Sequence, residues 1–161
     1  MRKIISLALI FTLTALACAC LCSCEKKRPA SDMMRDFCAE LGLRGTVFSP
    51  DVPEGESGYV SGDFFSSLYG ESDEYAADFA VVLLSDLEYA AECGVFICYS
   101  DVDAVRVTDM LHRRIELMRS VAAVSGLRFP EDAFVYREGR AVVMCALHGA
   151  PNARALWRAI L

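Results

Sequence analysis

Apolar residues in the C-terminal half of the chain follow two different periods. Residues 79–84 and 93–99 are short, almost unbroken apolar runs, which predict two buried strands. Ser100 or Asp101 then suits the N-cap of one long helix, and Gly126 suits its C-terminal end. The apolar positions of this helix recur at helical spacing and predict a single buried face, made of Ala104, Val107, Leu111, Ile115, Met118 and Ala122.

The end of the chain predicts a β-hairpin and a closing helix. Residues 133–137 and 140–147 are the two apolar arms, and Glu138-Gly139 between them suits a tight turn because glycine adopts positive φ readily. Pro151 is typical of a first helical turn. The apolar face of the helix after it is formed by Ala153, Leu156, Trp157 and Ile160.

Two short helices and a loop precede the first strand. Ser31 can cap the first helix and Gly42 can end it, and its apolar face consists of Met33, Met34, Phe37, Cys38 and Leu41. Residues 46–62 are rich in glycine, proline, serine and acidic residues, so we expect a loop that buries no face. Residues 63–69 predict a second helix, with inward-facing Phe64, Phe65 and Leu68.

This order of elements predicts an α+β fold. The two strands, the long helix, the hairpin and the closing helix make a ββαββα core, preceded by the short N-terminal helices. We expect an antiparallel four-stranded sheet with helices packed on one face, since one helical layer is the economical way to cover such a sheet. We assign this single domain to residues 31–161.

The first residues have the order of a secretion signal. Two basic residues precede an uncharged, apolar stretch, and Leu21-Cys22-Ser23-Cys24 resembles the processing box of bacterial lipoproteins. The resemblance implies that residues 1–23 are removed and that Cys24 carries the lipid, with acyl chains such as palmitate. Residues 24–30 would then tether the domain to membrane lipid, on the outer face of the cytoplasmic membrane. An uncleaved anchor, or cleavage without lipid, are the alternatives.

Charge and hydropathy exclude two classes of protein. The chain carries 16 Lys+Arg and 22 Asp+Glu, a formal net charge of −6. Loss of residues 1–23 would make it more acidic, because that segment holds two basic residues and no acidic one. An acidic domain gains nothing from counter-ion release, so we expect no nucleic-acid partner. No second apolar run is long enough for a multi-span transporter.

Three segments form a pattern: Ser66-Ser67-Leu68-Tyr69-Gly70, Ala91-Glu92 at the second strand, and Ser100-Asp101 before the long helix. Together they resemble a family of small lipoproteins of Gram-positive bacteria whose domain has no known function. A proline-containing connection, the hairpin and the closing helix extend the resemblance over residues 31–161. It implies a fold but no activity, cofactor or catalytic residue. This chain differs from the family in using arginine and in its four further cysteines.

Those four cysteines are Cys38, Cys93, Cys98 and Cys145. Outside the cytoplasm they could form disulfides, for instance from Cys93 or Cys98 to Cys145, although Cys93 and Cys98 are too far apart to pair within one extended strand. We favour the simpler interpretation that they are small buried hydrophobic residues. A zinc site built from Cys145, His148 and Cys93 or Cys98 would lack the usual close pairs of ligands, so we expect no metal.

Other candidate chemistry is weak. Ser57 lies in a G-x-S-x-G pattern that lacks its last glycine, and no phosphate-binding glycine motif is present, so we expect neither catalysis nor a cofactor. His112 belongs to the polar side of the long helix. The acidic residues at 101 and 103 are explained by helix capping rather than by a calcium loop.

Glu92 is the polar residue of greatest interest, because it stands at the entrance of an apolar strand. It could serve a site. The simpler interpretation, which we favour, is a structural charge that protects a sheet edge, or a partner for Arg106, Arg137 or Arg140.

We therefore expect a lipid-anchored, extracytoplasmic module that binds a ligand or an envelope or cell-wall partner without catalysis. The alternative is a surface thiol or redox protein, or a small enzyme, that uses one of the four downstream cysteines. Such a protein needs a thiol whose pKa is lowered, and it would be recognised by one cysteine reacting much faster than the others.

Overall fold

The computed structural model describes residues 28–70, 73–84 and 88–161. The predicted signal segment, the proposed lipid attachment at Cys24 and most of the tether lie outside the described residues. Within these residues one antiparallel sheet has the strand order β1-β2-β3-β5-β4. The strands are β1 (Val47–Phe48), β2 (Ala76–Leu84), β3 (Ala91–Cys98), β4 (Phe134–Glu138) and β5 (Ala141–Ala146).

The helices are α2 (Ala30–Leu41), α3 (Gly62–Tyr69), α4 (Asp101–Ser125) and α5 (Ala153–Ile160), with a short 3-10 turn η1 (Asp73–Tyr75) before β2. The α+β class and the antiparallel sheet are therefore confirmed. None of the described helices combines the length and the apolar composition needed to cross a membrane.

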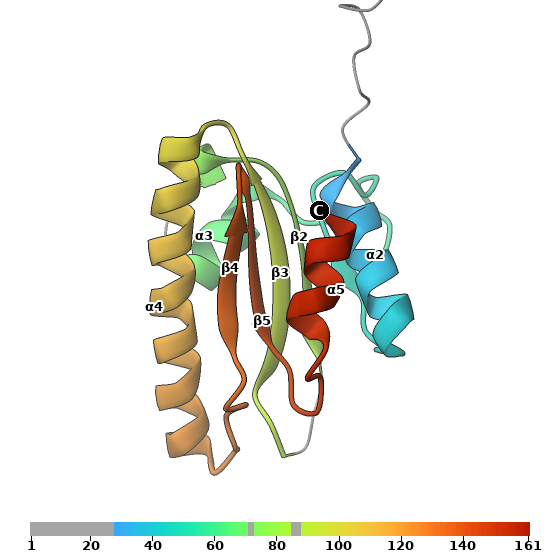
Figure 1. Cartoon of the computed structure of the whole chain (residues 1–161). Helices are drawn as coiled ribbons and strands as arrows, with labels where there is room; N and C mark the ends of the chain where they lie inside the picture. The colour runs from blue at the N-terminus through green and yellow to red at the C-terminus, as the bar shows by residue number, and fades with distance from the viewer. Residues whose placement is uncertain (1–27, 71–72, 85–87) are drawn as a thin grey trace, which may run out of the picture.

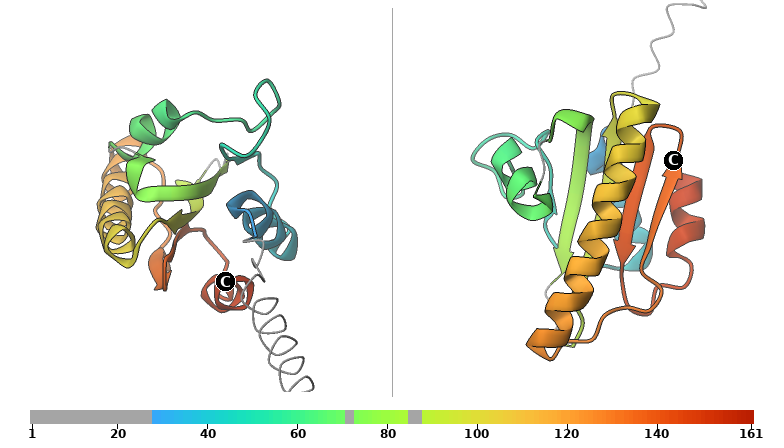
Figure 2. Two further views of the ribbon diagram at one scale, coloured as in Figure 1. Left: turned by 90° about the horizontal axis from the view of Figure 1, so that it is seen from above. Right: turned by 90° about the vertical axis from the view of Figure 1, so that its left-hand side faces the viewer.

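Helices cover both faces of the sheet, so the prediction of helices on one face is wrong. The helices α3 and α4 lie on one side, and α2 and α5 lie on the other (Figures 1 and 2). In β2, Phe79 and Val81 pack with the α4 core, whereas Ala80 and Val82 pack with the α2 and α5 core. A strand buried on both sides has no polar face, which explains the unbroken apolar run.

A fifth strand replaces part of the predicted loop. β1 pairs with β2 at the edge of the sheet, where the sequence predicted only four strands. Val52 and Val60 of the same segment are buried, and the buried Ser49 hydroxyl donates to the Phe79 carbonyl at 2.8 Å. The segment therefore does contribute to the core. Its strand escaped prediction because two residues are too short to show a period.

The long helix α4 has the predicted ends and the predicted buried face. Ser100 Oγ accepts the backbone N–H of Asp103 at 3.2 Å, and Gly126 has a φ of 73° directly after the last turn. All six apolar positions of the predicted face are buried. Asp101 forms an ion pair with Arg137 at 3.0 Å, so both acidic residues of the first turn have structural partners.

The start of α2 differs from the prediction. Its first amide, that of Ala30, donates to the Asp78 carboxylate of β2 at 2.7 Å. Ser31 is a buried residue inside the helix, and its hydroxyl donates to Asp51 at 2.5 Å instead of capping the helix. The cap thus comes from a residue distant in the sequence. Gly42 ends the helix as predicted, with a φ of 64°.

The hairpin and the closing helix are confirmed with small shifts. The turn between β4 and β5 consists of Gly139 and Arg140, one residue later than predicted, and Gly139 has a φ of 55°. The closing helix α5 begins two residues after Pro151. Its buried residues, Ala153 and Trp157, pack on the α2 side of the sheet.

Candidate functional site

Glu92 lies in β3, the central strand of the sheet, and only 2% of its surface is exposed. Its carboxylate accepts from Arg114 of α4, with Nε at 3.1 Å and a terminal guanidinium nitrogen at 2.5 Å from Oε2. The Arg114 side chain is itself only 18% exposed. A buried carboxylate requires such a partner, because burial without one destabilises the charged form strongly.

Tyr69 of α3 completes this buried cluster. Its hydroxyl donates to Glu92 Oε1 at 3.2 Å, and the Arg114 guanidinium lies over its ring at 5.9 Å from the centroid. Burial, together with the Glu92 charge, raises the pKa of Tyr69 well above its ordinary value. The phenol therefore remains a hydrogen-bond donor. Two helices thus hold the Glu92 carboxylate in place.

One interpretation of the sequence was that Glu92 protects a sheet edge. That interpretation is wrong, because β3 is the central strand. Arg114 is its partner, whereas the three arginines considered from the sequence have other contacts. Arg106 lies 3.9 Å from Asp103, Arg137 pairs with Asp101, and Arg140 donates to a backbone carbonyl. The hydrogen bonds of Glu92 explain it as a structural charge. A small cavity of about 240 Å³ lies beside Arg114 and is otherwise lined by apolar residues of α4 and by Ala90 and Ala91 at the start of β3.

The four described cysteines carry free thiols and are all buried. Cys93 of β3 and Cys145 of β5 are directly opposite each other on neighbouring strands. They belong to the α2 and α5 core, which also contains Cys38, whereas Cys98 belongs to the α4 core. The structure thus brings Cys38, Cys93 and Cys145 to one side of the sheet and places Cys98 on the other side.

Burial disfavours the thiolates of Cys38, Cys93 and Cys98. It raises the pKa of Cys38 and of Cys93, and it raises the pKa of Cys98 to about 11. A nucleophilic cysteine needs the opposite shift and access to solvent. The geometry of the folded domain therefore offers no support for the thiol-enzyme alternative.

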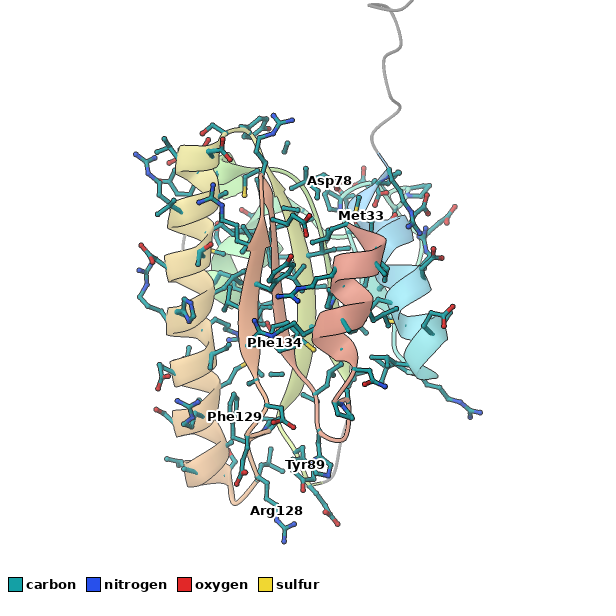
Figure 3. All side chains as sticks on the ribbon, in the orientation of Figure 1. Met33, Asp78, Tyr89, Arg128, Phe129 and Phe134 are labelled. Atoms are coloured by element: carbon teal, nitrogen blue, oxygen red, sulfur yellow. The ribbon has the colours of Figure 1, made fainter. Side chains whose placement is uncertain are left out.

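An open cavity of about 550 Å³ lies at the end of the sheet where β3 begins and β5 ends. Tyr89 precedes β3 and His148 follows β5, and their rings stack with centroids 3.9 Å apart and planes 9° apart. Figure 3 shows Tyr89, Arg128 and Phe129 at this end of the molecule. The complete lining is Tyr89, Arg128, Phe129, Glu131, Asp132 and His148.

Backbone hydrogen bonds hold this end of the molecule together. The amide of Ala90 donates to the Arg128 carbonyl at 3.0 Å, and the amide of Arg128 donates to the Glu88 carbonyl at 2.6 Å. The loop after α4 is thereby fixed beside the start of β3. A hydrogen bond with Tyr89 raises the pKa of Arg128, so the guanidinium stays charged.

A second cavity of about 420 Å³ shares one lining residue, Asp132, with the first. It is also lined by Phe134 of β4 and Arg154 of α5, and the Arg154 guanidinium lies over the Phe134 ring at 4.4 Å from the centroid. The linings of the two cavities together contain four aromatic rings, two arginines and two carboxylates. Such a surface can offer stacking, hydrogen-bond donors and hydrogen-bond acceptors to one ligand.

This surface was not predicted from the sequence. His148 was considered as a zinc ligand with Cys145, but Cys145 is buried in the core and His148 is exposed in the cavity. No group of three potential metal ligands occurs in the part of the chain that the structure describes. One signal was present: Tyr89 and His148 flank two apolar runs, and neighbouring antiparallel strands bring such positions to the same end.

Comparison with known proteins gives no assignment. No protein-family model, no curated protein and no solved structure matches the chain. The resemblance to small lipoproteins of Gram-positive bacteria therefore remains a hypothesis that depends on the residues that suggested it.

Proposed function

We propose that this protein is a lipid-anchored, extracytoplasmic binding module without catalytic activity. The observation that carries the proposal is the pair of cavities at the β3 and β5 end, the first of which is lined by the stacked Tyr89 and His148 rings. No reactive thiol or metal-ligand group in the described residues competes with this surface. The anchoring part of the proposal rests on the Leu21–Cys24 processing box.

The position of the cavities suits a tethered protein. The first described helix, α2, begins at the end of the molecule that carries Met33 and Asp78, and the first cavity is at the opposite end (Figure 3). A tether that enters through α2 would therefore direct the cavities away from the membrane. Two or three acyl chains on Cys24 would make such an anchor stable.

The chemistry of the lining indicates a polar ligand with a flat apolar side. Aromatic rings stack on such a side, while Arg128 and the carboxylates of Glu131 and Asp132 bind its polar groups. A sugar ring or short peptide of the cell envelope has these features. We therefore propose soluble peptidoglycan fragments as the first class of ligand to test.

A binding experiment tests this proposal on matched tyrosines. The full chain in detergent is titrated with soluble peptidoglycan fragments, and binding is followed by calorimetry. Tyr89→Ala removes one stacking ring and should weaken binding by about tenfold or more. Tyr99→Ala is the control, because Tyr99 is 59% exposed and follows β3, at the other end of the same strand. Equal affinities of the two variants, or no binding by the wild-type chain, would overturn this choice of ligand.

Photo-cross-linking tests the surface without assuming a ligand. A benzoylphenylalanine at position 148 lies in the cavity, and one at the exposed position 40 of α2 serves as the control. We expect a reproducible adduct on intact cells only from position 148. Identical adducts from both positions, or none from either, would contradict a binding role for this surface.

Intact mass tests the anchor. Protein extracted from native membranes should begin at Cys24 and carry acyl mass. A mass that begins at Met1 without lipid would contradict lipidation and would leave an uncleaved anchor as the explanation.

A further inference from the structure

Cys93 and Cys145 occupy directly opposite positions on the adjacent strands β3 and β5. Opposite residues of an antiparallel pair have Cα atoms roughly 4.5–5.5 Å apart, which lies within the range of about 4.4–6.8 Å that disulfides span. Both side chains belong to the same core, between the sheet and α2 with α5. The backbone therefore already has the separation and the side-chain direction that a cross-strand disulfide requires.

The side chains are in contact as well. The two thiols are close enough to hydrogen-bond to each other, and the Trp157 indole N–H lies beside the Cys93 sulfur. That indole N–H is buried and has no oxygen or nitrogen acceptor among the described residues. Cys38 of α2 belongs to the same core, but it lies in a helix and therefore has no paired position on either strand.

We propose that Cys93 and Cys145 close to a disulfide bond in the mature protein. The oxidant is a dithiol oxidoreductase in its disulfide form, or a small disulfide such as oxidised glutathione. One cysteine attacks the oxidant as a thiolate, which breaks the oxidant's S–S bond and forms a mixed disulfide. The second thiolate then attacks the protein sulfur of that mixed disulfide. Two protein thiols lose two electrons and two protons, and the oxidant leaves as two thiols.

The burial of the pair sets the time at which this reaction occurs. Cys93 is 0% exposed and Cys145 is 2% exposed, so an oxidant cannot reach them once α2 and α5 have packed. Burial also disfavours the thiolate of Cys93. The bond therefore forms while the chain folds, and it is afterwards protected from reductants. It links the neighbouring strands β3 and β5, which α4 and β4 separate in the sequence.

A refolding experiment tests the geometry independently of where the protein is located. The full chain is unfolded in urea with reductant, refolded in a glutathione redox buffer, quenched with acid and alkylated. We expect peptide mapping without reductant to recover one linked pair, Cys93 with Cys145. Cys98→Ser should leave this product unchanged, because Cys98 faces the opposite core. A linked pair that contains Cys38 or Cys98, or alkylation of both Cys93 and Cys145, would overturn the proposal.

Stability provides a second readout. The oxidised wild-type chain should unfold at a temperature about 10 °C above the reduced chain, since the bond restricts a long loop of the unfolded state. The double variant Cys93→Ala with Cys145→Ala should show no such difference. A reductant effect of equal size in the double variant would show that another bond is responsible.

The final test is the protein in its own membranes, and this arm rests on the proposed extracytoplasmic location. Membranes are acid-quenched and alkylated under denaturing conditions before reduction, and the same linked peptide is sought. Its presence supports the proposal. If the bond forms on refolding but not in the cell, the proposal that the mature protein contains it is overturned. The intact mass of the protein extracted from native membranes then shows whether the lipid anchor is also wrong. Neither result affects the cavity at Tyr89 and His148, which the binding experiments test separately.

Discussion

The Glu92 carboxylate depends on partners from two helices. Arg114 of α4 binds it through two nitrogens, and Tyr69 of α3 donates a third hydrogen bond. Glu92 is unusual in the sequence because an acid begins an apolar strand, whereas Arg114 was not predicted as its partner. A signal existed, because Arg114 follows Leu111 by three residues and precedes Met118 by four, which places it beside the buried face of the helix.

Removal of Arg114 alone should lower the free energy of unfolding more than removal of both the Arg114 and Glu92 charges. Arg114→Met leaves a buried, uncompensated carboxylate and should lower the free energy of unfolding by roughly 3 kcal/mol. The double variant with Glu92→Gln should recover part of that loss, because no charge is then buried. Urea denaturation of the wild type, both single variants and the double variant measures the coupling. Strictly additive losses would contradict a direct energetic link between the two side chains.

At the scale of elements, the start of α2 depends on a strand. The Asp78 carboxylate of β2 accepts the first amide of the helix, in the place where sequence analysis put Ser31. A capping residue from the neighbouring sequence is visible in a motif, as for Ser100 in α4. A capping residue from another element becomes visible only when the elements are packed.

Substitutions at Asp78 should distinguish the contribution of its oxygen acceptor to stability from the contribution of its charge. Asp78→Ala removes the acceptor and should lower the free energy of unfolding by about 1 kcal/mol. Asp78→Asn keeps an oxygen at the same place and should lose less. Urea denaturation at neutral pH measures both. A larger loss in the asparagine variant would show that the negative charge, rather than the hydrogen bond, stabilises α2.

The pH dependence of this position follows from its burial. Partial burial raises the pKa of Asp78 above its ordinary value of 3.8, and the hydrogen bond from Ala30 opposes the rise without cancelling it. The folded state therefore binds this proton more tightly than the unfolded state, and the wild type loses stability as the pH rises through the raised pKa. The stability of Asp78→Asn relative to the wild type should increase from pH 4 to pH 7. A difference that stays constant or decreases over this range, measured by urea denaturation, would contradict the raised pKa.

At the scale of the whole molecule, the two ends of the described chain meet on one face of the sheet. Phe37 of α2 stacks on Trp157 of α5 with ring centroids 4.3 Å apart, and both side chains are fully buried. This contact covers the core that holds Cys93 and Cys145. The second helical layer thus depends on packing between segments that are distant in the sequence.

Truncation of Trp157 should test this layer. Trp157→Ala should lower the free energy of unfolding by roughly 4 kcal/mol, because it leaves a large cavity under α2 and α5. Trp157→Phe should lose much less, since it keeps an aromatic ring against Phe37 and removes an indole N–H that lacks an oxygen or nitrogen acceptor in the described residues. Chemical denaturation followed by circular dichroism compares them. Equal losses would mean that the stacking contact contributes little.

Local features of this protein could be predicted from residue spacing alone: the buried face and both ends of α4, the glycine that ends α2, the hairpin and the α+β class. These features depend on interactions within one or two helical turns or across one tight turn, so neighbouring residues specify them. Three other features required the packed fold: the coverage of both faces of the sheet, the position of Cys93 opposite Cys145, and the stacking of Tyr89 on His148 at a cavity. Strand register and helix packing set these contacts between distant residues. Each contact adds little free energy alone, so the residue pattern of a single segment does not predict it.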